Sequence, residues 1–239
     1  MHDQDLANLH CLALETSGAW GSAALGRGPN ILAARALAQP RQYAAEFLPT
    51  IQELCAEHQT APPDVRLVFI SSGPGSFTGL RIGVTAARMI SLSSGARLVA
   101  IPTLDVIAQN ALGAEPAVDR VAVVLDAKRG NVYAASYRRK GAVMEAQSTA
   151  AEVEPFAFLS GLPADCAVLG EGVTYHRPAI ERASRMILPE PLWPPRAETV
   201  YRLGYAKALA GQFVNRRDLI PVYIRPPEAE EKFAARPNP

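Results

Sequence analysis

The most specific group of chemically useful residues is the string SGPGSFTGLRIG at residues 72–83, a glycine-rich turn that leads into a predicted helix. Ser76 or Thr78 can cap this helix, and the free backbone N–H groups of its first turn, with the Arg81 guanidinium nearby, can hold an anion. The string lacks the Gly-Lys-Ser/Thr of a P-loop, and its glycine spacing differs from the dinucleotide-binding pattern. A purely structural turn is the alternative, and we favour it over an anion site.

A second candidate anion site is the turn after the first predicted strand, where Thr16 and Ser17 follow Glu15. Sugar kinases and actins fold a hairpin around nucleotide phosphates here, with an Asp-x-Gly-Thr type of turn. In this chain Glu15 replaces the aspartate, and Trp20 adds bulk where a phosphate must approach the backbone closely. We therefore do not expect the chain alone to bind ATP tightly.

Asp126 ends the apolar run VAVVLD and is the best single candidate for a catalytic carboxylate. It can hold a metal-bound water. Alternatively, it can cap the turn that follows or pair with Lys128 or Arg129, which is the interpretation we favour. The four histidines include no pair four residues apart, so a metallopeptidase helix gains little support. We assign no catalytic residue and no metal ligand.

The elements that must position these residues alternate between strands and helices, which predicts an α/β fold. A first unit has predicted strands at residues 11–14, 22–25, 31–36, 67–71 and 98–101, and predicted helices at residues 43–58, 78–92 and 104–112. A second unit begins near residue 110. Its predicted strands are at residues 121–125, 132–137 and 167–170, followed by a helix at residues 196–211.

The composition limits the partners and the compartment. The chain has 239 residues, is 49% hydrophobic and carries a formal net charge of +1, so no global field draws it to nucleic acid or to an anionic membrane. Its cysteines, Cys11, Cys55 and Cys166, lie far apart in apolar surroundings, which is typical of a reduced protein. No apolar stretch is long enough to span a bilayer and no leader pattern is present, so we expect a cytoplasmic protein.

Five blocks of sequence resemble one protein family, in the order that the family has them. They are residues 12–25, 71–91, 101–111, 126–137 and 221–226. On these blocks the chain resembles the TsaB family, formerly YeaZ, of the bacterial threonylcarbamoyladenosine machinery. The resemblance implies an actin-like ATPase (ASKHA, RNase H-like) fold with two subdomains, residues 1–108 and 109–217. It also implies a tail, residues 218–239, that returns to the first subdomain.

The resemblance further implies a non-catalytic partner of TsaD, the subunit that holds the metal and transfers the threonylcarbamoyl group to adenosine beside the anticodon. TsaE joins through the TsaD complex, and tRNA is reached indirectly. No cofactor is expected on this chain alone, because ATP and metal are implied on the partner subunits.

The family's partner surface corresponds to the predicted helices at residues 43–58 and 78–92. The expected contacts are Leu48, Ile51, Cys55, Gly79, Gly83 and Ala87. Burial of each in the chain's own core is the rival explanation, and a homodimer through the same helices is a further possibility. Alternative functions are a metallopeptidase of the glycoprotease type, a small-molecule kinase of the sugar-kinase type, and a self-associating scaffold.

Overall fold

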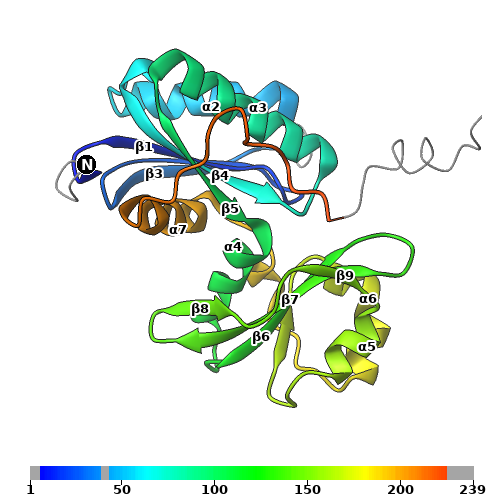
Figure 1. The fold of residues 1–239 in the computed structure, drawn as a ribbon. Coiled ribbons are helices and arrows are strands. Elements are labelled where there is room, and N and C mark those ends of the chain that lie inside the picture. The colour runs from blue at the N-terminus through cyan, green and yellow to red at the C-terminus, as the bar shows by residue number, and fades with distance from the viewer. Residues whose placement is uncertain (1–5, 39–42, 225–239) are drawn as a thin grey trace, which may run out of the picture.

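The computed structural model describes residues 6–38 and 43–224 and contains two α/β units, each built on its own sheet (Figure 1). The first sheet has the order β3-β2-β1-β4-β5. Its strands are β1 (His10–Glu15), β2 (Ser22–Arg27), β3 (Asn30–Ala36), β4 (Val65–Gly73) and β5 (Arg97–Pro102). β2 runs antiparallel to β1 and β3, whereas β4 runs parallel to β1 and β5. All five strands predicted for the first unit are confirmed.

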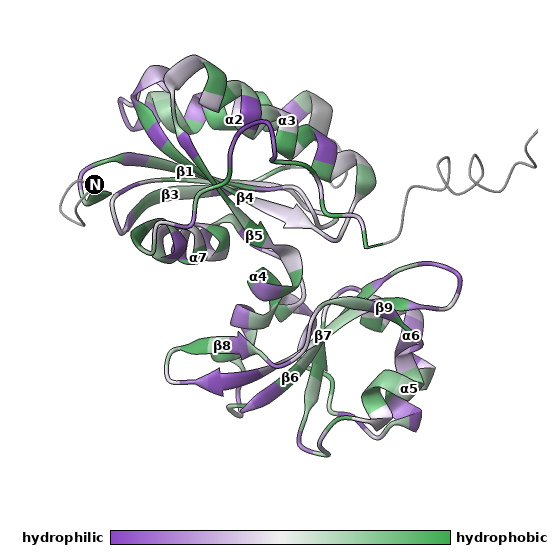
Figure 2. Cartoon of the chain, viewed as in Figure 1, coloured by the Kyte–Doolittle hydropathy of each residue, from purple (hydrophilic) through white to green (hydrophobic). Residues whose placement is uncertain are grey.

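Helices cover both faces of the first sheet. α2 (Tyr43–Glu57) and α3 (Phe77–Ser94) lie on one face, and α7 (Ala197–Leu209) lies on the other (Figure 1). The central strands β1 and β4 are buried on both faces, which explains their continuous apolar sequences. Both α2 and α3 mix hydrophobic and hydrophilic residues along their length (Figure 2), as expected for helices with one buried face. The predicted α2 and α3 are confirmed.

The second unit follows α4 (Thr103–Asn110), which links the two sheets (Figure 1). Its sheet has the order β10-β6-β7-β8, with β9 also paired to β7. The strands are β6 (Arg120–Asp126), β7 (Val132–Lys140), β8 (Val143–Ala146), β9 (Ala151–Val153) and β10 (Ala167–Leu169), and the helices are α5 (Pro155–Ser160) and α6 (Gly172–Arg182). A separate apolar core fills this unit. Within the described residues, no helix combines the length and the apolar character needed to cross a membrane.

The chain returns to the first unit before residue 217, where the second subdomain was expected to end. α7 packs against β1, β4 and β5, where Tyr201 donates a hydrogen bond to the Gly28 carbonyl at 2.7 Å and contacts the Phe69 ring edge-on. The helix therefore belongs to the first unit, because its apolar face fills the core on that side of the sheet. Of the predicted tail, Val222 N–H donates to the Ser72 carbonyl at 2.7 Å, and residues 225–239 lie outside the described residues.

Candidate functional site

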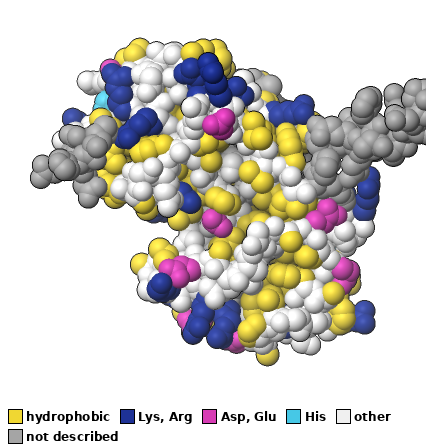
Figure 3. All heavy atoms as spheres, in the orientation of Figure 1, with side chains coloured by type: hydrophobic (Ala, Val, Ile, Leu, Met, Phe, Trp, Pro, Cys, Tyr) yellow, Lys and Arg dark blue, Asp and Glu magenta, His cyan; other side chains and the backbone are white. Residues whose placement is uncertain are grey.

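Two adjoining cavities, of about 440 and 150 Å³, lie between the two units and share four lining residues, Gly18, Ala19, Leu125 and Glu171. We call this space the cleft. The turn between β1 and β2 borders it from the first unit, and the turn between β6 and β7 borders it from the second. Hydrophobic side chains gather where the two units meet on the face displayed in Figure 3. Each bordering turn follows a strand that ends in a carboxylate, Glu15 or Asp126.

Glu15 is fully buried, and its carboxylate accepts hydrogen bonds within its own turn. Its Oε1 accepts hydrogen bonds from Ser17 N–H at 2.5 Å, from Ser17 Oγ–H at 2.6 Å and from Gly18 N–H at 3.3 Å. Burial raises the pKa of the Glu15 carboxyl, against the lowering effect of these hydrogen bonds. The backbone donors that a phosphate would need in this turn are therefore already bound to Glu15.

α3 packs directly on the same turn, and two glycines permit the contact. A Cβ atom at position 79 would lie 2.0 Å from the Thr16 carbonyl oxygen, and one at position 83 would lie 2.2 Å from Thr16 Oγ1. Ser76 N–H donates to the Ser17 carbonyl at 2.8 Å, and Ser76 Oγ caps the helix by accepting from Gly79 N–H at 3.2 Å. These donors have partners within the chain, which supports the structural interpretation of the string over an anion site.

Arg81 lies over Phe77, the first residue of α3. Its guanidinium lies 3.9 Å from the centre of the Phe77 ring, and its Nε donates to the Tyr223 hydroxyl at 3.2 Å. The Tyr223 ring also contacts Phe77, with 5.4 Å between ring centres. Arg81 thus joins α3 to the returning C-terminal segment.

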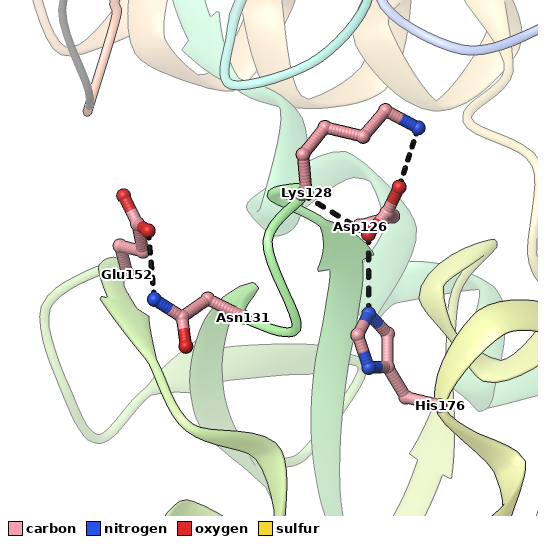
Figure 4. Close-up of polar contacts among 5 residues, drawn as sticks. All are labelled: Asp126, Lys128, Asn131, Glu152 and His176. Atoms are coloured by element: carbon pink, nitrogen blue, oxygen red, sulfur yellow. Dashed lines mark hydrogen bonds and ion pairs between the residues drawn. The ribbon is translucent and has the colours of Figure 1, made fainter.

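Asp126 is bound to two partners at the end of β6 (Figure 4). Its Oδ2 lies 2.6 Å from Lys128 Nζ, its Oδ1 accepts from Lys128 N–H at 3.1 Å, and the same Oδ1 lies 3.1 Å from His176 Nε2. Partial burial works to raise the pKa of Asp126, but the hydrogen bonds from Lys128 and His176 outweigh it and hold that pKa below its ordinary value. The predicted pairing with Lys128 is confirmed.

Sequence reasoning missed His176 because it lies fifty residues away, on α6. It occupies a kink with φ −121°, two residues before Pro178, which cannot supply a helical N–H donor. The kink is the signal in the sequence that could have marked the position. In the described part of the chain, no three side chains of His, Cys, Asp or Glu are grouped so that they could hold a metal ion.

The predicted partner contacts on α2 and α3 need correction. Only Leu48 is exposed, to 54%, whereas the other five are buried, namely Ile51, Cys55, Gly79, Gly83 and Ala87. The small residues of α3 are small because the helix lies against the Thr16 turn and the sheet, so packing in the chain's own core explains them.

Two exposed apolar residues in the C-terminal half of α3 lie away from this buried face. Met89 and Leu92 are each 58% exposed, and with Leu48 of α2 they form what we call the outer helix face. Helical spacing could have found them, because they alternate with the buried positions Gly83, Ala86 and Ala87 at the period of a helix.

Comparison with known proteins gives a consistent result. Residues 30–194 match the family model described as TsaD, tRNA N6-adenosine threonylcarbamoyltransferase. The chain is 27% identical over 228 residues to the tRNA threonylcarbamoyladenosine biosynthesis protein TsaB of Bacillus subtilis, covering 93% of this chain and 96% of the relative. It is 27% identical to the Escherichia coli protein of that name, covering 82% and 87% of the two chains. A solved structure, YeaZ from Pseudomonas aeruginosa, superimposes with a TM-score of 0.77 at 26% identity, covering 89% of this chain and all of that one.

Proposed function

The chain belongs to the TsaD family as a relative of its TsaB members, and we propose that it acts in the biosynthesis of threonylcarbamoyladenosine in tRNA. In this proposal it is a cytoplasmic, non-catalytic partner of a TsaD enzyme and supports threonylcarbamoyl transfer to adenosine beside the anticodon. TsaE joins through the TsaD complex. The observation that carries the proposal is the match to a TsaB protein over 93% of this chain and 96% of the relative.

The non-catalytic role is supported by the state of the two carboxylates beside the cleft. Glu15 is buried and occupied by Ser17 and Gly18, so it cannot reach a bound nucleotide or its metal. Asp126 is engaged by Lys128 and His176. We therefore place ATP and the metal on the partner subunits rather than on this chain.

The outer helix face is the surface that we propose for the TsaD enzyme. Apolar side chains that a monomer leaves exposed are the ones that an interface can bury, and Leu48, Met89 and Leu92 meet this condition. The buried residues Gly79 and Gly83 do not, so a substitution such as Gly83→Arg would disrupt the fold instead of the interface.

The test is light scattering coupled to size exclusion, with the full chain alone and mixed with the TsaD enzyme of its own organism. We expect a complex of one copy of each, weakened about tenfold or more by Leu92→Glu or Met89→Glu, because a charge would be buried at the contact. Leu209→Glu is the matched control, since Leu209 is also an exposed apolar side chain, 42% exposed, but lies on α7 at the opposite face of the sheet.

If the wild-type chain does not bind the TsaD enzyme, the proposed partnership is wrong. Self-association that Leu92→Glu abolishes, without any binding of the enzyme, would instead support a self-associating scaffold. Equal loss of the complex in Leu92→Glu and Leu209→Glu would place the interface elsewhere.

A further inference from the structure

The exposed aromatic side chains are concentrated at the cleft. Trp20, Phe77 and Tyr175 are 46%, 41% and 58% exposed, and they are the aromatic members of the large hydrophobic residues that the described part of the chain leaves exposed. Trp20 lines the smaller cavity, and Phe77 and Tyr175 line the larger. We call these three residues the aromatic rim. They come from the β1–β2 turn, the start of α3, and α6.

Cationic side chains lie against two of the three rings. Lys128 Nζ is 5.2 Å from the centre of the Tyr175 ring, and the Arg81 guanidinium is 3.9 Å from that of Phe77. The Lys128 side chain is 77% exposed even though it contacts Asp126. Its backbone has φ +62°, a conformation that non-glycine residues rarely adopt, and this turn holds Lys128 at the edge of the larger cavity.

Acidic and basic side chains both border the larger cavity. Glu171, Asp126 and Lys128 line it, and Arg81 lies over the Phe77 ring. Phosphate groups are attracted to the Lys128 and Arg81 side chains and repelled by the Glu171 carboxylate. Carboxylates, in contrast, accept hydrogen bonds from the exocyclic amino groups of bases. The exposed Lys128 ammonium therefore suits a phosphate backbone at the mouth of the cleft, with bases against the aromatic rings.

We propose that the aromatic rim binds unpaired bases of an RNA loop, which makes this chain a direct contact for tRNA. The proposal deepens the proposed function and rests on it for the identity of the RNA. Aromatic faces with neighbouring cations are the usual means by which proteins hold unstacked bases of single-stranded RNA. A free nucleoside triphosphate fits less well, because Glu15 already binds the N–H groups of Ser17 and Gly18 that would hold its phosphates.

The experiment titrates the full chain with a fluorescently labelled RNA hairpin that has an unpaired loop, and with a blunt duplex of the same stem. We expect the hairpin to bind more tightly than the duplex. Trp20→Ala and Tyr175→Ala should each weaken hairpin binding by about 5-fold or more, as the loss of one stacked base predicts. Lys128→Ala should reduce the salt dependence of binding. Met186→Ala is the matched control, because Met186 is 47% exposed and lines neither cavity of the cleft.

Equal affinity for hairpin and duplex would overturn the proposal, as would rim variants that bind like Met186→Ala. Efficient competition by ATP would identify a nucleotide site instead of an RNA site, and would overturn it too. The same titrations are repeated with the complex of this chain and the TsaD enzyme. If that complex forms normally but the rim substitutions do not change its affinity for RNA, the rim proposal fails while the partner function stands.

Discussion

The two hairpins that border the cleft are built alike but use their carboxylates differently. In each, an apolar strand pairs antiparallel with the next and ends in an acidic residue, Glu15 opposite Ser22 and Asp126 opposite Val132. Glu15 is fully buried with a raised pKa, whereas Asp126 borders the cavity with a lowered pKa. The position of an acid at a strand end therefore does not decide its role.

The helix beside each turn accounts for the difference. α3 closes over the first turn, because Gly79 and Gly83 let its backbone approach Thr16, and Glu15 is left without access to solvent. α6 approaches the second turn through His176, a side chain that supports Asp126 from one side and leaves Lys128 exposed on the other. The first turn is thus part of the core, and the second presents charge to the cleft.

The largest expected effect comes from the difference in how tightly the two turns are packed. Gly79→Ala places a methyl group 2.0 Å from a backbone oxygen, so we expect the free energy of unfolding to fall by about 3 kcal/mol. Gly130→Ala is the counterpart in the second turn, where a Cβ meets nothing within 4 Å and only the φ of +83° opposes it. We expect a loss of about 1 kcal/mol there. Urea unfolding of both variants measures the difference, and equal losses would contradict it.

The next effect concerns pH and has opposite signs at the two carboxylates. The pKa of Glu15 is raised above its ordinary 4.5, so its contribution to stability is present below pH 4.5 and is lost as pH rises through the folded pKa. The pKa of Asp126 is lowered from 3.8, so its contribution is present above pH 3.8 and is lost as pH falls through the folded pKa.

Two isosteric variants test these signs. Relative to the wild type, Glu15→Gln should gain stability as pH rises from about 4 to 8, because glutamine cannot ionise in the buried turn. Asp126→Asn should be less stable than the wild type by about 1 kcal/mol at neutral pH, and the difference should vanish in acid. The measurement is urea unfolding from about pH 2 to pH 8, so that it covers the titration of both carboxylates. Parallel pH profiles for the two variants would show that the two turns do not differ as described.

Much of this contrast was accessible from the sequence at the level of elements. The apolar runs that end in Glu15 and Asp126 predicted both hairpins, and the pairing of Asp126 with Lys128 follows from their closeness in the chain. The role of the glycine string could not be resolved in the same way. Helical spacing places Gly79, Gly83 and Ala87 on one face, but it does not say whether that face meets a partner or the chain's own sheet.

Contacts between residues distant in the sequence were not predictable from local pattern. His176 reaches Asp126 across fifty positions, and α7 crosses back to the first sheet after the whole second unit. The grouping of Trp20, Phe77 and Tyr175 likewise depends on how the units are placed, because each residue comes from a different element. Each of these contacts depends on which apolar faces pack together. The sequence shows which faces are apolar, but it does not show which face packs against which.

The smallest expected effect tests whether Lys128 stabilises its turn or serves the cleft. Lys128→Ala removes an ion pair whose ammonium side is 77% exposed, so we expect a loss of stability below about 0.5 kcal/mol. Lys140→Ala is the matched control, since Lys140 is 75% exposed and pairs with Glu145 at 3.1 Å outside the cleft. Similar small losses in urea unfolding would mean that Lys128 contributes little to stability. A loss of about 2 kcal/mol for Lys128→Ala alone would instead show that Lys128 stabilises the second turn. The two carboxylates would then differ in their burial, and not in whether their turns serve the cleft.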